Sequence, residues 1–258
     1  MIQAGFEFEF GHDVRTNLIT QVIKHHFPDN KIYVIDDEFE EYKLRSKHYF
    51  IFKTDISVNV YGCKYANTEM TTPVFIGKKA ILESFKKIFD ILRVLDVKTD
   101  NSCSVHINVS FTEDEETQRI NLGKMYVFIN ELQQLKIFGR GNNVYCKQCI
   151  SRKRCMSIIR DAKNDNDLIK RLEKYLLLSA EEHHQAIAFD KQENKELYIT
   201  EFRFIGGDYI DKFEDANKIL NTTLDAMYFA IGKNKKNNIS DVLKKFKFNN
   251  RLGEDLKE

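Results

Sequence analysis

The chain has 258 residues, with 40 Lys and Arg against 39 Asp and Glu, so its net charge of +1 provides no overall field that attracts nucleic acid or a membrane. Hydrophobic residues make up 42% and charged residues 31%, a composition typical of a globular protein with a sizeable core. No apolar run approaches the roughly 20 residues that span a bilayer, and the N-terminus lacks the basic-then-apolar order of a signal peptide. We therefore expect a cytoplasmic protein without a membrane or nucleic-acid partner.

The first predicted element is a strand over 5–11, with the sequence GFEFEFG. Glu7 and Glu9 stand two residues apart, and residues two apart in a strand point to the same face. Three phenylalanines alternate with them and cover the opposite face. Neighbouring carboxylates repel unless a cation or a proton lies between them, so this pattern favours a divalent metal site. A half-exposed N-terminal strand is the alternative interpretation.

The next predicted elements are a helix over 14–27, strands over 31–35 and 48–61, and a helix over 77–95. In the strand over 48–61, Asp55 and Ser57 share one face. Glu69 follows in the segment TEMTTP, where a proline ends the strand. A further strand over 104–111, SVHINVSF, places Ser104, His106 and Asn108 on one face and three apolar residues on the other.

The second half of the chain predicts helices over 113–138, 165–178 and 211–231, two strands over 184–189 and 197–205, and a short helix over 241–246. In the second of these strands Glu201 and Arg203 share a face. We find no repeat and no linker between domains. The expected division is one catalytic domain over 1–232 followed by a polar segment over 233–258.

The stretch over 145–160 contains three of the five cysteines, Cys146, Cys149 and Cys155. An odd cysteine count without a secretory signal indicates reduced thiols, and part of a zinc site is the alternative. The same stretch carries the basic residues Lys147, Arg152, Lys153, Arg154 and Arg160. A solvated helix face explains these charges, and neutralisation of phosphate is the rival explanation.

Four predicted strands thus carry apolar residues on one face and chemically versatile polar residues on the other. The polar set comprises Glu7, Glu9, Asp55, Ser57, His106, Asn108, Glu201 and Arg203, with Glu69 close by. Oxygen ligands with a single imidazole and a guanidinium suit Mg²⁺ or Mn²⁺ holding phosphate oxygens better than they suit zinc.

The segments GFEFEFG, DIS followed by EMTTP, CSVHINV and EFRFIGG resemble, in this order, the sequence blocks of the amidoligase family. This family belongs to the glutamine synthetase and glutamate–cysteine ligase superfamily of ATP-dependent carboxylate–amine ligases. The resemblance extends over 5–207. It implies an α+β fold, a curved antiparallel sheet with helices on its convex side, as in the catalytic domain of glutamine synthetase.

The resemblance also implies roles for individual residues. The implied metal ligands are Glu7, Glu9, Glu69, His106 and Glu201. Nucleotide contacts are expected from His106, Asn108, Ser57, Arg203 and Arg152. Catalytic roles are expected for Arg203 on the transferred phosphoryl group, for Arg140 on the γ-phosphate and for Asp55 as a base. Arg140, Arg152 and Arg154 are, in that order, the candidates for the phosphate clamp.

Three positions depart from the family pattern. Ser104 replaces a glycine, Ile56 replaces a glycine, and Asn108 replaces a second histidine that could carry a positive charge. The expected activity is an ATP- and Mg²⁺-dependent ligase that joins a carboxylate, such as glutamate or a glutamate-ended peptide, to an amine through an acyl phosphate. The alternatives are a metal-dependent phosphohydrolase or kinase, and a catalytically silent module that binds nucleic acid or an acidic protein.

Overall fold

The computed structural model describes residues 1–35, 48–112, 120–142, 146–179, 185–191, 198–234 and 237–251. These residues form helices and a sheet, which confirms the expected α+β class. They belong to two compact units, Met1–Thr112 with Arg203–Leu220 and Glu113–Phe202 with Asn221–Glu258. Within the described part of the chain, no helix is both long and apolar enough to cross a membrane.

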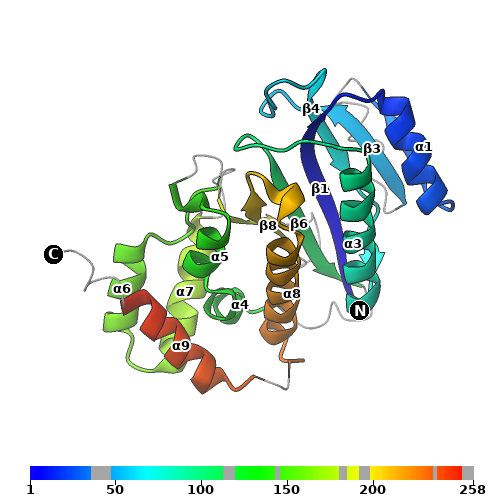
Figure 1. Ribbon diagram of the computed structural model, residues 1–258. Helices are drawn as coiled ribbons and strands as arrows, with labels where there is room; N and C mark the ends of the chain where they lie inside the picture. Colours follow the sequence, from blue (N-terminus) through cyan, green and yellow to red (C-terminus); the bar gives the residue numbers. More distant parts are fainter. Residues whose placement is uncertain are drawn as a thin grey trace. The chain divides into compact units, whose positions relative to one another are not determined.

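Strand β1 (Ile2–His12) is the central strand of the first unit (Figure 1). It pairs antiparallel with β4 (Tyr65–Thr71) on one side and with β6 (Ser104–Phe111) on the other. The strand order from the edge is β2 (Lys31–Val34), β3 (Tyr49–Thr54), β4, β1, β6 and β8 (Tyr198–Gly206), with β5 (Phe75–Ile76) paired to β1. Only the residues of β8 from Arg203 onwards belong to this unit.

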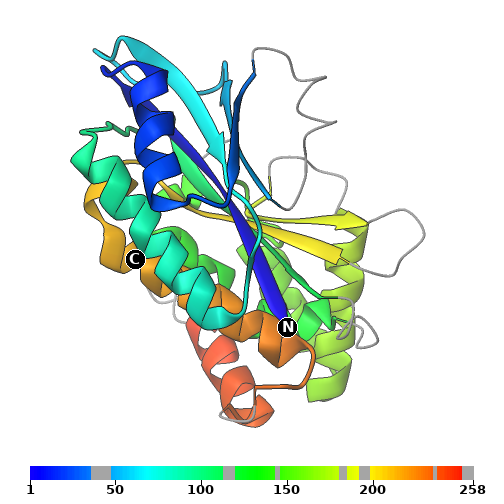
Figure 2. The same cartoon turned by 90° about the vertical axis from the view of Figure 1, so that its right-hand side faces the viewer.

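The sheet differs from the expected antiparallel one, because β2 pairs with β3 in parallel and the sheet is therefore mixed. A parallel pair needs a crossover connection of about a dozen residues or more, and the chain between Val34 and Tyr49 is long enough for one. The strand predicted over 48–61 ends at Thr54, because Asp55 and Ser57 form a turn there. The sheet is open, and its strands twist and curve relative to one another (Figure 2).

The phenylalanine face of β1 forms the core of the first unit, as the alternating sequence predicts. Phe6, Phe8 and Phe10 are fully buried. They face helix α3 (Lys78–Val94), where ring centroids lie 4.8 Å apart for Phe6 and Phe85 and 5.7 Å apart for Phe8 and Phe89. Burial of each such ring stabilises the fold by about 1.5–3 kcal/mol. Helix α3 and this face of the sheet therefore hold β1 in place.

Residues 203–220 complete this core. The short helix η3 (Tyr209–Asp211) places the ring of Tyr209 near Phe8, and its hydroxyl donates a hydrogen bond to the backbone oxygen of Glu9 at 2.9 Å. Helix α8 (Phe213–Ala230) begins with a ring that lies 5.3 Å from Phe89. Tyr209, 200 residues further along the chain, thus fixes the backbone of β1 at Glu9.

The first helix of the unit lies next to its edge strand, β2. Helix α1 (Thr16–His26) corresponds to the helix predicted over 14–27 and buries Ile19 and Ile23. Gly11, at the end of β1, contacts the turn after β3 so closely that a Cβ atom there would lie 2.6 Å from the Cβ of Val60. A side chain at this position would push the turn away from the strand.

The second unit is mostly helical. Its elements are α4 (Leu122–Ile129), α5 (Glu131–Ile137), η2 (Arg140–Asn142), α6 (Arg152–Asp161), α7 (Asp165–Ser179), β7 (Ile187–Lys191), the N-terminal part of β8, the C-terminal part of α8, and α9 (Ile239–Arg251). Strand β7 pairs antiparallel with β8, which confirms the predicted hairpin strands.

One helix predicted over 113–138 is two helices in the structure, and residues 113–119 lie outside the described residues. Asn130, between the two helices, has a φ of 52°, a left-handed conformation that asparagine adopts more readily than most residues. Its backbone conformation ends α4 and redirects the chain into α5. Gly123 allows α4 to contact α7, because a Cβ atom there would lie 2.2 Å from the backbone oxygen of Ile169.

Helix α9 is longer than the short helix predicted over 241–246. Leu243, Phe246 and Asn250 are buried, so this helix is part of the packed second unit. The expected division into a catalytic domain over 1–232 and a polar segment over 233–258 stays a prediction.

Candidate functional site

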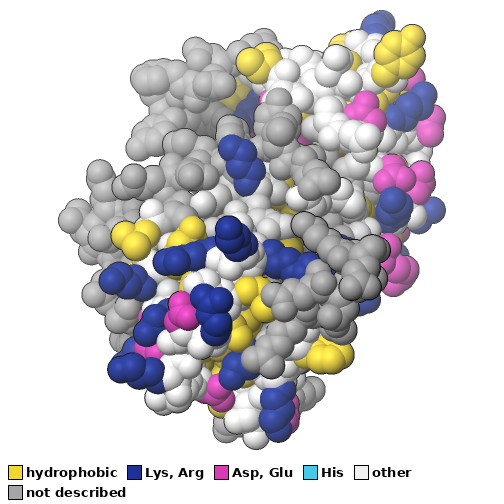
Figure 3. Space-filling view, turned by 90° about the vertical axis from the view of Figure 1, so that its left-hand side faces the viewer, with side chains coloured by type: hydrophobic (Ala, Val, Ile, Leu, Met, Phe, Trp, Pro, Cys, Tyr) yellow, Lys and Arg dark blue, Asp and Glu magenta, His cyan; other side chains and the backbone are white. Residues whose placement is uncertain are grey.

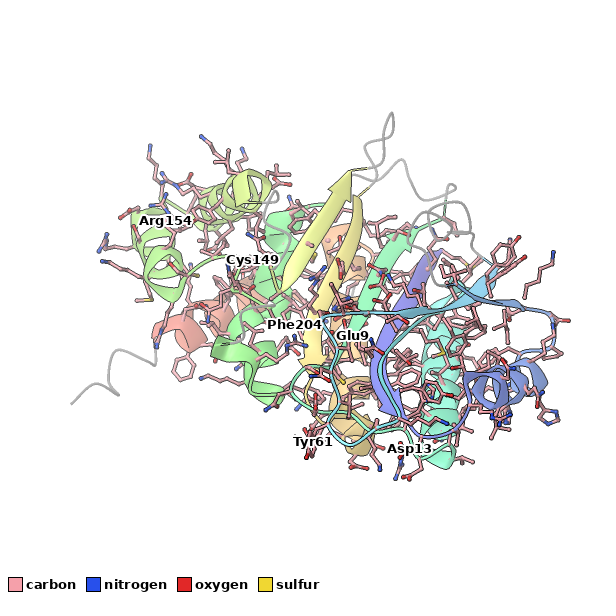
Figure 4. The ribbon with its side chains drawn as sticks, turned by 90° about the horizontal axis from the view of Figure 1, so that it is seen from above. Glu9, Asp13, Tyr61, Cys149, Arg154 and Phe204 are labelled. Carbon is pink, nitrogen blue, oxygen red and sulfur yellow. The ribbon has the colours of Figure 1, made fainter. Side chains whose placement is uncertain are left out.

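The two glutamates of β1 lie on the face opposite the phenylalanine core, and strand pairing brings further polar residues next to them. In the pairing with β4, Glu9 lies directly opposite Glu69. In the pairing with β6, Glu7 lies directly opposite His106. Cross-strand partners of this kind have neighbouring side chains on one face of the sheet. The register thus gathers three of the predicted metal ligands around Glu9, which Figure 4 labels.

Three carboxylates form the centre of this cluster. One oxygen each from Glu9, Asp55 and Glu69 lies within 4.8 Å of the other two. Glu9 is 6% exposed and Glu69 is 5% exposed. Asp55, just after β3, accepts hydrogen bonds at 2.7 Å from both the backbone nitrogen and the hydroxyl of Ser57. The turn therefore aims Asp55 and gives Ser57 a positioning contact, while the nucleotide contact expected of Ser57 stays a prediction.

His106 joins the two glutamates of β1. Its Nδ1 lies 2.9 Å from a Glu7 oxygen, and its Nε2 lies 2.8 Å from the hydroxyl of Ser104 and 3.6 Å from a Glu9 oxygen. The Ser104 hydroxyl donates to Glu9 at 2.6 Å, so its oxygen is available to accept from the Nε2 of His106. Both ring nitrogens of His106 are thus placed to donate hydrogen bonds.

Two departures from the family pattern have structural roles here. The amide nitrogen of Asn108 donates to Glu7 at 3.0 Å, which orients that carboxylate without adding charge. Ser104 is 3% exposed and links Glu9 to His106. The sequence placed Ser104 on the correct face but assigned it no role, because its bridging position depends on the register between β1 and β6.

Lys53 is a residue of the cluster that the sequence analysis missed. Its ammonium lies 3.1 Å from an oxygen of Glu69, and its side chain is 21% exposed. The alternation of β3 could have identified it, because Lys53 precedes Asp55 by two residues and such residues share a face. The cluster therefore holds a fixed positive charge among its carboxylates.

Burial and neighbouring charges shift the pKa values of these acids in opposite directions. Burial raises the pKa of Glu69 to about 8, and the charge of Glu7 adds to this shift while Lys53 opposes it. Burial also acts to raise the pKa of Glu7, but the hydrogen bond and charge of His106 outweigh burial and lower this pKa to about 2. Burial favours the neutral form of Asp55 as well, yet hydrogen bonds from Ser57 and Glu69 lower its pKa overall. The raised pKa of Glu69 favours its neutral form, which can donate a hydrogen bond to the Asp55 carboxylate.

The donor set fits a hard divalent cation. Ligands of one Mg²⁺ at about 2.1 Å in octahedral geometry lie roughly 3–4 Å from one another, close to the spacing of these carboxylates. Glu9 on β1, Asp55 just after β3 and Glu69 on β4 converge beside the ammonium of Lys53. Converging acids of this kind, with shifted pKa values, are typical of functional sites.

The other predicted site residues are divided between the two units. Arg203 belongs to the first unit, on β8, and its side chain is half-buried. Glu201, Arg140 and Arg152 belong to the second unit. Arg152 donates a hydrogen bond at 3.2 Å to the backbone oxygen of Asn250, so it joins α6 to the end of α9. The phosphate-binding roles expected for these arginines stay predictions.

The three cysteines of the stretch over 145–160 are buried thiols. Burial raises the pKa of Cys149 strongly and that of Cys155 to about 12, which favours the thiol over the thiolate that zinc binds. Among the described residues, neither cysteine belongs to a group of three potential metal ligands. Cys149 instead donates its backbone nitrogen to the buried Glu131 at 2.8 Å.

Comparisons with known proteins add little to this description. No family model and no curated protein matches the chain. A weak structural similarity is found to 3-hydroxy-3-methylglutaryl-coenzyme A reductase of Streptococcus pneumoniae, with 8% sequence identity and a TM-score of 0.18, over 98% of this chain and 70% of that chain. A TM-score this low carries no argument about fold or function.

Proposed function

We propose that the protein is an ATP- and Mg²⁺-dependent carboxylate–amine ligase of the amidoligase type, which forms an amide or isopeptide bond in the cytoplasm. The observation that carries the proposal is the convergence of Glu9, Asp55 and Glu69 within 4.8 Å on the polar face of the sheet. The ordered sequence blocks support the same conclusion. The finer fold assignment, a glutamine synthetase-like catalytic sheet, is part of the proposal.

Each residue of the cluster has a defined task in this scheme. Glu9, Asp55 and Glu69 would hold Mg²⁺ or Mn²⁺, which neutralises charge on the phosphate oxygens of ATP when bound. His106 and Asn108 orient Glu7 through hydrogen bonds of 2.9 and 3.0 Å. These contacts fix the rotamer of Glu7 before a ligand arrives, which lowers the ordering cost of binding.

The proposed reaction has two steps on the substrate. A carboxylate oxygen attacks the γ-phosphorus of ATP and ADP leaves, which gives an acyl phosphate. The amine then attacks the acyl carbon, phosphate leaves, and the amine gives up a proton. We assign Arg203 to the charge on the moving phosphoryl group. The role of Asp55 as the base for the amine is the alternative to its role as a metal ligand. Glutamate and glutamate-ended peptides are the proposed carboxylates.

Trapping of the intermediate tests this reaction. Hydroxylamine should replace the amine and give a hydroxamate together with equal amounts of ADP and phosphate. Glu9→Gln should abolish the product, whereas Glu83→Gln, on the exposed face of α3 at 66% side-chain exposure, should leave it unchanged. If the protein hydrolyses ATP without a carboxylate and forms no hydroxamate, the ligase proposal is wrong and the protein is a phosphohydrolase.

Metal binding provides a readout that does not depend on turnover. Calorimetric titration with Mn²⁺ should show binding to the unaltered protein and to Glu83→Gln, and much weaker binding to Glu9→Gln. If all three proteins bind Mn²⁺ equally, the cluster is not the metal site. If none binds metal or nucleotide, the catalytically silent binding module is the better description.

A further inference from the structure

A second surface lies in the second unit, on helices α6 and α7. A groove there has a lining that includes Arg154, Asp161, Asp167, Arg171, Lys174 and Tyr175. Figure 3 shows Lys and Arg side chains gathered on this side of the molecule. Residues 147–179 contain nine Lys and Arg and four Asp and Glu, a local charge of +5 in a chain with a net charge of +1. This groove is distinct from the carboxylate cluster, whose residues belong to the first unit.

The two acids of the groove already have positive or hydrogen-bonding partners. Asp161 pairs with Arg160 at 3.1 Å, and Asp167 pairs with Arg171 at 2.9 Å. Two cations remain for a ligand, because within the described ranges no carboxylate lies at ion-pair distance from Arg154 or Lys174. The Arg154 guanidinium lies 5.4 Å from the centre of the Tyr175 ring, a cation–π contact that holds it over the groove.

Apolar surface accompanies these charges. Leu178 is 72% exposed, and Ile158 and the half-buried Tyr175 also line the groove. An exposed leucine beside cations matches a ligand that combines negative charge with an apolar side chain. Arginine and tyrosine are also the residue types that most often dominate binding energy in protein interfaces.

We propose that this groove binds an acidic peptide segment of a partner protein, with one apolar residue over Leu178 and carboxylates against Arg154 and Lys174. A peptide can place its carboxylates beside the two cations and present uncharged residues to Asp161 and Asp167, so that it avoids repulsion there. A nucleic acid carries a charge at every nucleotide and would bring phosphates next to those two acids. The Tyr175 face that a base would stack on is already covered by Arg154.

A direct binding measurement tests this proposal. The probe is a short fluorescein-labelled peptide of Asp and Glu around a central Leu, followed by fluorescence anisotropy. Charge reversal of both Arg154→Glu and Lys174→Glu should weaken binding about tenfold or more, since each lost ion pair becomes a repulsion. The matched control is Arg93→Glu with Lys136→Glu, an exposed arginine and an exposed lysine on other helices, which should bind as the unaltered protein does.

A second variant separates binding from folding. Leu178→Ser removes apolar surface without a change of charge, and the exposure of this residue means that the fold should tolerate the substitution. Leu178→Ser should weaken binding of the peptide with a central Leu but should not change binding of the same peptide with a central Ser. Equal binding by all variants, absence of peptide binding, or tighter and more salt-sensitive binding of an oligonucleotide of equal charge would each overturn the proposal.

Discussion

Substitution of Glu69 by glutamine tests the electrostatics of the carboxylate cluster most directly. In the folded protein the pKa of Glu69 is raised from 4.5 to about 8, chiefly by burial and then by the charge of Glu7. The neutral form is therefore favoured by folding. Below the pKa of Glu69 in the unfolded chain, this group does not change the free energy of unfolding with pH. The free energy of unfolding falls as the pH rises from 4.5 to about 8, and it is constant again above about pH 8.

The size of this effect follows from the shift. One pKa unit corresponds to about 1.4 kcal/mol, so ionisation of Glu69 costs the metal-free protein on the order of 4 kcal/mol between about pH 5 and pH 8. The opposite shift of Glu7, whose pKa is lowered to about 2, acts only at more acidic pH. Glutamine has the same shape and can still accept from Lys53, but it cannot ionise.

Urea unfolding followed by circular dichroism suits this chain, which contains no tryptophan. In the presence of a chelator, Glu69→Gln should be more stable than the unaltered protein at about pH 9, and the two should converge near about pH 5. Glu83→Gln, an exposed glutamate on α3, should follow the unaltered protein throughout. Mg²⁺ should stabilise the unaltered protein at about pH 9 and have little effect on Glu69→Gln. Identical pH profiles for Glu69→Gln and the unaltered protein would refute the reasoning.

Two further substitutions test the packing that supports the site and the second unit. Tyr209→Phe removes the 2.9 Å hydrogen bond to the backbone oxygen of Glu9 and should cost about 1–2 kcal/mol in urea unfolding, with a fall in Mn²⁺ affinity that calorimetry can detect. An unchanged unfolding curve would show that this hydroxyl does not hold β1. Gly123→Ala places a methyl group 2.2 Å from the backbone oxygen of Ile169 and should lower stability by about 1–3 kcal/mol, while Gly141→Ala, with open space at its Cβ, should change it far less. Equal stability of the two alanine variants would contradict the close contact of α4 and α7.

The sequence alone determined which residues share a face of each strand. Alternation with a period of two is a local property of the backbone, so the segment GFEFEFG sufficed to separate Phe6 and Phe8 in the core from Glu7 and Glu9 on the polar side. The sequence also predicted helix α3, because its apolar residues repeat at helical spacing.

Only the tertiary structure decided which of these faces meet. The contact of Glu9 with Glu69 depends on the register of β1 against β4, and the bridge of Ser104 depends on β1 against β6. Register is set by hydrogen bonds and packing between segments far apart in the chain, which no local pattern specifies. For the same reason the parallel pairing of β2 with β3 escaped prediction. Local alternation thus places each glutamate on the polar face of its strand, and long-range pairing of the strands brings the carboxylates together.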